Sequence, residues 1–439
     1  MLFVLTSIHV STFTKGKSMI QVERIDGPHG IPIYFQQLPG IVKPASLRWL
    51  VFVGGADDIS IGQPGLYHWF EHVPFRGTAR FPGGYADTGE RFERYGGKIG
   101  AHTWPICTTY HCNVPTRFWR EAFDVITDLA AQPLLTDEGI SAEREIIRDE
   151  IQRALSRIDR YAWYHLRQIL WPDHPLARDV LGSEDSLQSM APDLLRTAHT
   201  MGYDRSRCVL LAAGSMSKSE LLDAVAEHAE RFPVRNLPER RHPATFGPVP
   251  AWHDGKTTVR ETSFPSSVVA VLFPIPQRPP TEFLRQWSML TEAFSAGGLG
   301  SPLLRILREE RNLVYHASVA CSTFPDGGFW GFTAQTRTEN VDAVLQGFWD
   351  VLHDERARSA ERYAYVKDAV RSELDMRVVD PDAFTETVED RLLWSGDVVN
   401  DHDHVERMVT VTHEEVLYLL STLNPERAHT TIFRGMQQS

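Results

Sequence analysis

The chain carries the same succession of four elements twice. In its first part, an apolar strand leads to a Thr-Arg pair at Thr116, an amphipathic helix, and a second helix that opens with Ser-Ala-Glu-Arg at Ser141. In its second part the same order returns, with Thr-Arg at Thr336 and Ser-Ala-Glu-Arg at Ser359. The separation between the copies is nearly constant. We therefore infer a duplication, which requires both halves to fold around a similar set of strands and helices.

A proline-rich stretch separates the two copies. It runs from Phe232 to Trp252, where prolines interrupt the periodic pattern and favour an extended, semi-rigid connection. The short apolar run at the N-terminus has its lysines after it and lacks a small-residue cleavage site, so it is a poor secretory signal. We divide the chain into a disordered extension at 1–18, an N-terminal domain at 19–232, a linker at 233–257 and a C-terminal homologous domain at 258–439.

Each half mixes strands and helices without the regular alternation of a doubly wound sheet. Apolar runs rich in β-branched residues and bounded by glycine or proline predict strands at SLRWLVFVGG, RCVLLAAG and VVAVLFPIP. A period of 3.6 residues predicts helices at FWREAFDVITDLAAQ and LLDAVAEHAERF. We therefore predict the α+β class, with two homologous α+β domains joined by the proline-rich linker.

The charge and hydropathy of the 439-residue chain exclude some classes of partner. The formal net charge of -12 at pH 7 gives no overall basic field to attract nucleic acid or an anionic membrane. No stretch reaches about 18 consecutive apolar residues, the length of a membrane span. The four cysteines form no CxxC pair, and Cys107 and Cys112 fall on opposite faces of one predicted strand, which favours reduced thiols. We expect a cytoplasmic protein that binds neither nucleic acid nor membrane.

The segment GLYHWFEHVPFRGT holds two histidines and a glutamate at helical spacing. We expect a helix from Pro64 through Phe75, since proline is tolerated at an early helical position. His68 and His72 then lie one turn apart on one face and can present two imidazoles to a single ion. Glu71, beside them, can reach past that ion.

Two imidazoles and one carboxylate, with a fourth position open to water, form a catalytic zinc site. Zinc lowers the pKa of its water, and a nearby carboxylate such as Glu71 accepts the proton as the oxygen attacks a peptide carbonyl. The order H-x-x-E-H is that of H-E-x-x-H reversed. With 18 histidines in the chain, a chance match has a frequency of roughly a few per cent. The motif alone therefore leaves two surface histidines near a helix end as an alternative.

A third ligand is expected on a second helix, in SAEREIIRDEIQRAL. Glu143 and Glu150 are two helical turns apart and share one face. One of them can bind the metal while the other orients a histidine ring, and the spacing does not say which does which. Glu145 and Asp149 are interpreted as part of a solvated face.

The chain resembles the pitrilysin/insulinase/mitochondrial processing peptidase family of inverted-motif zinc metallopeptidases. The resemblance rests on GLYHWFEHVPFRGT, EREIIRDEI and HPLARDVLGSEDSL, and the likeness runs from about Met19 to the end. It implies that Glu150 is the third zinc ligand, that Glu143 supports the site, and that Glu71 activates a zinc-bound water. The second half has no H-x-x-E-H, so we expect one Zn²⁺ per chain and a zinc-free C-terminal domain that supplies substrate contacts.

The second half also resembles the family, in GGLGSPLLRILREERNLVYHASV. The resemblance implies that Arg308 and Tyr315 hold the substrate backbone and stabilise the tetrahedral intermediate, and a guanidinium and a phenol suit a developing oxyanion. A charged helix that leads into a strand is the alternative interpretation.

One departure from the family concerns the edge strand that receives the peptide. Family members usually carry Asn-Ala there, whereas this chain has Gly100-Ala101 in GKIGAHT. An extended peptide can still add to this edge through main-chain bonds. His102 could replace the missing amide, with a plain strand residue as the alternative.

The resemblance implies a zinc-dependent endopeptidase that cleaves short or unfolded peptides between two clamshell halves, in peptide maturation or processing. It also implies a homodimer, with a heterodimer containing a related subunit as an alternative. A non-catalytic structural or interaction subunit is the other alternative, although such members typically lose a ligand or the base. His68, Glu71, His72 and Glu150 are all present here.

Overall fold

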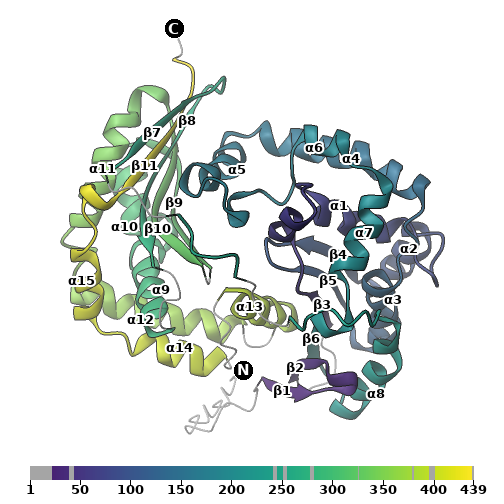
Figure 1. The fold of residues 1–439 in the computed structure, drawn as a ribbon. Coiled ribbons are helices and arrows are strands. Elements are labelled where there is room, and N and C mark those ends of the chain that lie inside the picture. The colour runs from purple at the N-terminus through teal and green to yellow at the C-terminus, as the bar shows by residue number, and fades with distance from the viewer. Residues whose placement is uncertain are drawn as a thin grey trace, which may run out of the picture.

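The two halves fold as two α+β units, with the C-terminal half on the left of Figure 1 and the N-terminal half on the right. This computed structural model describes residues 22–38, 44–240, 245–250, 255–276, 281–324, 326–377, 380–394 and 401–437. The predicted extension at 1–18 lies outside these residues, as do parts of the predicted linker. The domain boundaries stay predictions.

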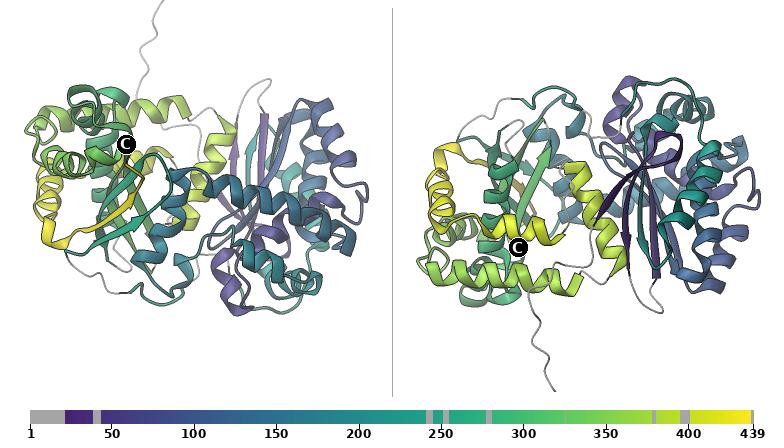
Figure 2. Two further views of the ribbon diagram at one scale, coloured as in Figure 1. Left: turned by 90° about the horizontal axis from the view of Figure 1, so that it is seen from above. Right: turned by 90° about the horizontal axis from the view of Figure 1, so that it is seen from below.

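Each half contains one sheet, and Figure 2 shows helices covering the outer face of both sheets. The N-terminal half consists of β1 (Glu23–Asp26), β2 (Pro32–Gln37), β3 (Pro44–Val51), α1 (Leu66–His72), α2 (Tyr85–Tyr95), β4 (Lys98–Thr103), β5 (Thr108–Pro115), α3 (Trp119–Ala131), α4 (Asp137–Leu155), α5 (Ile158–Leu170), α6 (Glu184–Ser189), α7 (Pro192–Gly202), β6 (Cys208–Gly214) and α8 (Lys218–His228). The C-terminal half consists of β7 (Thr257–Glu261), β8 (Ser267–Ile275), α9 (Thr281–Ser295), α10 (Pro302–Leu304), β9 (Val314–Phe324), β10 (Gly327–Thr336), α11 (Val341–His353), α12 (Ala360–Arg377), α13 (Pro381–Trp394), α14 (Asp401–Val409), α15 (His413–Ser421) and β11 (His429–Arg434).

The two sheets have the same topology, which confirms the duplicated α+β fold. The N-terminal sheet has the order β1-β2-β6-β3-β5-β4, and the C-terminal sheet has the order β7-β11-β8-β10-β9. Apart from β1, each strand has a counterpart, and the parallel pair falls in the same place, between β2 and β6 and between β7 and β11. The strands β4 and β9 are therefore corresponding edge strands.

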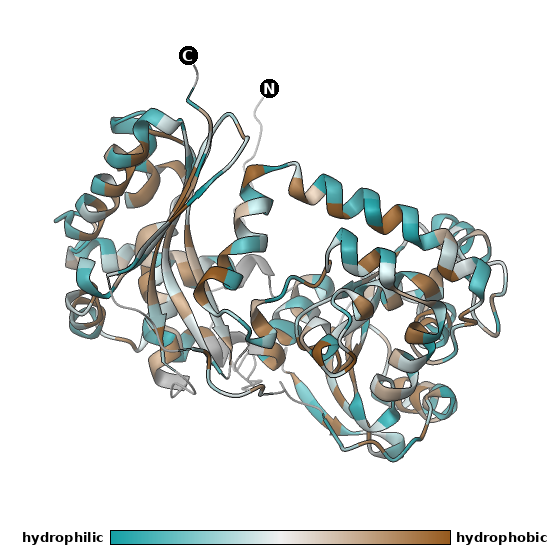
Figure 3. Ribbon diagram, turned by 45° about the horizontal axis from the view of Figure 1, so that its top comes forward, coloured by the Kyte–Doolittle hydropathy of each residue, from teal (hydrophilic) through white to brown (hydrophobic). Residues whose placement is uncertain are grey.

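Strand β3 shows why a central strand carries apolar side chains on both of its faces. Trp49 points to the helices of its own half, where it stacks on Phe123 and donates from Nε1 to Thr127 Oγ1 at 2.9 Å. Leu50 and Phe52 belong to a separate core, which they share with residues of the C-terminal half. A strand buried on both faces needs apolar side chains at successive positions. Figure 3 shows the resulting contrast between hydrophobic strands and outer helices of mixed hydropathy.

Helix α13 of the C-terminal half binds the N-terminal sheet through a buried charge. The Arg48 side chain on β3 and the Glu389 side chain on α13 are each 3% exposed, and Arg48 Nη1 donates to Glu389 Oε2 at 3.0 Å. Arg48 also donates from Nη2 to Asp382 Oδ1 at 2.8 Å and from Nε to Thr385 Oγ1 at 2.8 Å. An unpaired charge is strongly unfavourable in a protein interior. This pairing therefore fixes how the helix meets the sheet.

The helix that carries the metal motif is shorter than the predicted Pro64–Phe75. Helix α1 ends at His72 and continues as a 3₁₀ turn at Val73–Arg76. Gly65 precedes it with a left-handed φ of 84°, in a place where a Cβ would come 2.8 Å from a carbonyl oxygen. Pro74 lacks the N–H that would continue the α-helical bonds. The backbone at both ends therefore limits the helix to two turns.

The cysteines and the helix lengths bear on the predictions of reduced thiols and of no membrane span. All four cysteines are free, and Cys112 lies buried in β5 while Cys107 is buried just before that strand. In the part of the chain that the structure describes, no helix combines the length and the apolar character needed to cross a bilayer.

The docking of α13 predicts a specific sensitivity to acid. Burial favours the neutral form of Glu389, but the hydrogen bond and charge of His102 and the charge of Arg48 hold the pKa of this carboxyl at about 2, below its ordinary 4.5. Such a group stabilises the fold above pH 4.5 and loses this contribution as the pH falls towards 2, to a total on the order of 3 kcal/mol. We expect the urea midpoint of Glu389→Gln to lie well below that of the wild type at pH 6, and the gap to narrow by pH 3. A gap that does not change with pH would contradict this assignment.

Candidate metal centre

Helices α1 and α4 bring the three predicted ligands together. Glu150 Oε2 on α4 lies 3.7 Å from His68 Nε2 and 3.5 Å from His72 Nε2 on α1. One donor atom from each residue lies within 4.8 Å of the other two. Glu145 and Asp149, on the same helix as Glu150, are exposed to solvent. Two segments that are distant in sequence thus form one cluster of metal-binding groups.

The two distances from Glu150 to the histidines fit a tetrahedral zinc ion. At bond lengths of about 2.0–2.1 Å, the ligand atoms of such an ion lie about 3.4 Å apart, close to the 3.5 and 3.7 Å seen here. Two nitrogens and one carboxylate are the donors of catalytic zinc sites. Burial, followed by the neighbouring His72, lowers the pKa of His68 to about 3, which keeps this imidazole neutral and able to bind a metal.

The charges around His72 favour a cation at the same place. Burial lowers the pKa of His72, but the hydrogen bond to Glu143 and the charges of Glu71, Glu150 and Glu143 outweigh it and raise the pKa. In the absence of an ion, these carboxylates favour positive charge on the imidazole. A divalent metal ion would supply that charge instead, so the site is electrostatically suited to one.

Glu143 orients the second histidine. Its Oε2 lies 3.2 Å from His72 Nδ1, and its Oε1 accepts a hydrogen bond from Arg76 Nε. Burial opposes ionisation, but the bonds from His72 and Arg76 lower the pKa of Glu143 and keep it charged. A carboxylate on Nδ1 fixes the ring so that Nε2 faces the metal position, towards Glu150.

Glu71 is a buried carboxylate whose pKa is raised. It is 7% exposed, and its Oε2 accepts a 2.6 Å hydrogen bond from Thr103 Oγ1 on β4. Burial raises the pKa of Glu71, against the smaller opposing effects of the Thr103 bond and the nearby imidazoles of His72 and His102. A carboxylate with a raised pKa is a stronger base. Glu71 therefore binds a proton more readily than Glu143 does.

The edge strand β4 carries the predicted substrate contacts Gly100, Ala101 and His102. Gly100 lies opposite His111 of β5, and a Cβ at Gly100 would come 2.9 Å from His111 Nε2. This imidazole therefore occupies the space that an asparagine side chain would need. Ala101 packs against the N-terminal core, and His102 Nε2 lies 2.7 Å from Glu389 Oε1. His102 is thus engaged by the other half of the chain.

Tyr315 lies in a β-bulge of β9, the edge strand of the C-terminal sheet that corresponds to β4. His316 pairs with Gln335 and Val314 pairs with Thr336, so Tyr315 is the extra residue between them. Its side chain is 59% exposed. Bulges redirect side chains and are frequent beside active sites. The bulge therefore turns a phenol to solvent at a sheet edge.

Arg308 precedes that strand, in a turn of π-helix at Arg305–Glu310. Its side chain is about half exposed, and its Nε lies 3.7 Å from Glu309 Oε1. Across the described ranges, no hydrogen bond or ion pair joins Arg308 or Tyr315 to the three metal-binding side chains. The structure does not bring these two parts of the predicted site into direct contact.

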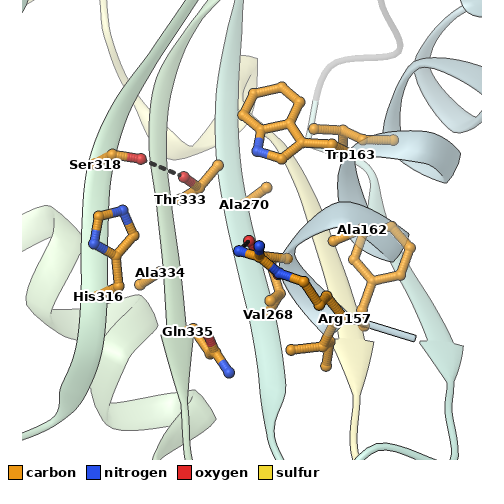
Figure 4. A pocket seen from close by; sticks show the side chains of 14 residues that line it. Arg157, Ala162, Trp163, Val268, Ala270, His316, Ser318, Thr333, Ala334 and Gln335 are labelled. Carbon is orange, nitrogen blue, oxygen red and sulfur yellow. Dashed lines mark hydrogen bonds and ion pairs between the residues drawn. The ribbon is translucent and has the colours of Figure 1, made fainter. Parts of the chain in front are cut away.

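A cavity of about 540 Å³ lies between helix α5 and the C-terminal sheet (Figure 4). Trp163 of α5 and Arg157, just before that helix, line one side, and His316 and Ser318 of β9 line the other. His316 directly follows Tyr315. The volume falls in the range of about 300–1,000 Å³ that is usual for ligand sites. The cavity is therefore large enough for a ligand and is lined by the residue that follows Tyr315 in the chain.

Sequence reasoning misses three residues that support the site. Arg76 has only a weak local signal, because it lies four residues after His72 but beyond the end of the predicted helix. Thr103 directly follows the predicted contacts Gly100–His102 and carries no signal of its own. Glu389 comes from the other half, and no periodic pattern connects it to the edge strand.

Two family models match the chain. The model described as "Insulinase (Peptidase family M16)" matches residues 42–184, and the model described as "Peptidase M16 inactive domain" matches residues 189–370. The chain belongs to peptidase family M16. The first match contains His68, Glu71, His72 and Glu150, while the second covers much of the half that lacks the motif.

The relatives agree with this assignment. An uncharacterized zinc protease of Streptomyces coelicolor is 25% identical over 92% of this chain and 88% of its own length. The beta subunit of the mitochondrial-processing peptidase of Saccharomyces cerevisiae is 22% identical over 89% of this chain and 86% of its own length. The crystal structure of a protease from Helicobacter pylori superposes with a TM-score of 0.80 at 14% identity, covering 95% of this chain and all of that one. The family and the relatives' names support a zinc-using peptidase.

Removing the charge that orients His72 should weaken zinc binding. We expect Glu143→Gln to lower zinc affinity by about 10–100-fold, the usual effect of losing a partner of a metal-binding histidine. Competition with a chelator, read by native mass spectrometry, measures this affinity. The matched control is Glu145→Gln on the exposed face of the same helix, which should leave the affinity unchanged. Equal affinities for all three proteins would show that Glu143 does not support the metal.

Proposed function

We propose that the protein is a zinc-dependent endopeptidase that cleaves short or unfolded peptides. The observation that carries the proposal is a buried carboxylate, Glu71, beside the converging donors of His68, His72 and Glu150. A structural site needs only ligands, whereas a peptidase also needs a base. Glu71 makes no ion pair among the described residues and has a raised pKa, which suits it to accept a proton.

The side chains of the site have separate roles in the proposed reaction. His68, His72 and Glu150 would hold the zinc, which when bound supplies Lewis acidity that lowers the pKa of water and polarises the scissile carbonyl. Glu71 takes the proton from the attacking water and then delivers it to the leaving amine. Thr103 holds the Glu71 carboxylate through its hydroxyl. Glu143 keeps the ring of His72 aligned.

We place the peptide along the free edge of β4, where Gly100, Ala101 and His102 offer main-chain groups. At Gly100 the His111 imidazole fills the space that a side chain would take, and it is the nearest polar side chain there. Arg308 and Tyr315 would stabilise the oxyanion, as exposed donors of a guanidinium and a phenol. The cavity between α5 and the C-terminal sheet would hold residues of the peptide beyond the cut (Figure 4).

We further propose that the peptidase works as a homodimer, since Arg308 and Tyr315 are exposed and do not contact the metal-binding side chains of their own chain. A heterodimer with a related subunit is the second candidate, favoured by the likeness to a processing peptidase subunit. Maturation or processing of peptides is the proposed role of either assembly.

Cleavage should depend on Glu71. We expect the wild type to cut a mixed library of unstructured peptides, read by mass spectrometry, and Glu71→Gln to lose at least about 10³-fold in rate because the proton acceptor is gone. Zinc content should stay at one ion per chain, since Glu71 is not a ligand. The control Glu145→Gln should cut at the wild-type rate. Full activity of Glu71→Gln with zinc bound would rule out the proposed base.

The oxyanion role of the C-terminal half can be measured separately. We expect Arg308→Ala and Tyr315→Phe each to lower kcat/KM by about 10²-fold, with little change in thermal stability because both side chains are exposed. Tyr418→Phe, on the exposed face of α15, is the matched control and should be neutral. Unchanged kcat/KM in both variants would remove these residues from the site.

Mixtures of these variants show whether one chain completes the site of another, and the wild-type chain alone tests for a heterodimer. If each site in a homodimer takes its Arg-Tyr pair from the other chain, mixing Glu71→Gln with Arg308→Ala restores part of the activity. If each chain is complete, the mixture is no more active than its parts. Inactivity of the wild-type chain alone, with zinc bound, would favour the heterodimer.

A further inference from the structure

Glu389 reaches from the C-terminal half to the end of the edge strand β4. Its Oε1 accepts a hydrogen bond from Thr109 Oγ1 at 2.6 Å and from Trp104 Nε1 at 3.2 Å, and it lies 2.7 Å from His102 Nε2. The other oxygen, Oε2, accepts from Arg48 Nη1 at 3.0 Å. One buried carboxylate thus binds four side chains of the N-terminal half.

These contacts surround Thr103, the residue that binds the proposed base. His102 and Trp104 are its neighbours in the chain, and Thr109 is the cross-strand partner of His102. Thr103 itself faces the opposite side of the strand, where its hydroxyl donates to Glu71 Oε2 at 2.6 Å. A displacement of residues 102–104 would therefore move the hydroxyl that holds Glu71.

We infer that Glu389 is a positioning residue for catalysis, which acts through Thr103 on Glu71 and makes the active geometry depend on the docking of the two halves. The inference rests on the proposed function. The Glu389 carboxylate binds both chain neighbours of Thr103 and also the adjacent strand β5. Glu71, the proposed base, is therefore aligned only when α13 lies against the sheet. Glu389 contacts the edge strand at His102, while its hydrogen bonds within the described ranges include none of the three metal-binding side chains.

Helix α13 offers a matched control for this role. Glu386 accepts from the same guanidinium, Arg48 Nη2, at 3.3 Å, but its side chain is 57% exposed. Glu386→Gln removes one charge from the same helix and the same partner without changing a contact to β4. An effect that both variants share shows that α13 is less firmly docked on the sheet. An effect of Glu389→Gln alone shows that the contacts of Glu389 with the edge strand matter.

The test combines turnover with hydrogen exchange. We expect Glu389→Gln to lower kcat by about tenfold with KM and zinc content nearly unchanged, because the base is misaligned while the ligands are intact. Glu386→Gln should keep the wild-type kcat. Thr103→Val should lower kcat by a similar factor, and its combination with Glu389→Gln should lose no more than the worse single variant, since both act on one contact.

Amide exchange read by mass spectrometry decides the positioning role without turnover. Peptides covering residues 98–104 should exchange faster in Glu389→Gln than in Glu386→Gln or the wild type. If Glu389→Gln does not fold, Thr109→Val removes one neutral bond to the same oxygen and should act in the same direction. Multiplicative losses in the double variant, equal effects of the two glutamate variants, or unchanged exchange at 98–104 would overturn the inference. Absence of any cleavage by the wild type, with exchange altered as expected, would instead count against the proposed function.

Discussion

A buried guanidinium decides how the two halves meet. Arg48 belongs to a central strand of the N-terminal sheet, yet its carboxylate partners Asp382 and Glu389 belong to a helix of the C-terminal half. Separation of the halves would leave this charge without its partners, which costs far more than the pairing gains. The shared apolar core, with Leu50 and Phe52, is buried at the same junction. Apolar burial thus supplies affinity between the halves, while the charge fixes their relative position.

The duplicated topology places two edge strands in corresponding positions and gives them different chemistry. Strand β4 has a smooth edge with a glycine, and it approaches the metal helix, where Thr103 binds Glu71. Strand β9 has a bulge at Tyr315 and no metal helix beside it. The same scaffold therefore places a buried carboxylate beside the edge strand in one half and an exposed phenol on it in the other.

The sequence predicts the duplicated fold and the metal cluster because both are encoded by periodicity. His68, Glu71 and His72 lie within about one helical turn, and Glu143 and Glu150 are two turns apart, so helical geometry alone groups them. Spacing could not say which glutamate faces the metal, because that depends on how α4 lies against α1. The family resemblance supplied this assignment, and the contacts of Glu150 agree with it.

Other features could not be predicted because they arise from packing between distant segments. The start of α1 depends on the left-handed backbone of Gly65 against a neighbouring loop, so the helix prediction was too long. The pairing of His102 with Glu389 joins two halves that share no local pattern. Cross-strand neighbours such as Gly100 and His111 become known only when the register is known.

The close approach at Gly100 has a consequence for substitution. Because His111 Nε2 would lie 2.9 Å from a Cβ at position 100, any side chain there displaces this imidazole. An asparagine at position 100 requires the imidazole of His111 to move aside or to be replaced by a smaller side chain. Positions 100 and 111 are therefore coupled through the register of the two strands, so that the residue at one position limits the choice at the other.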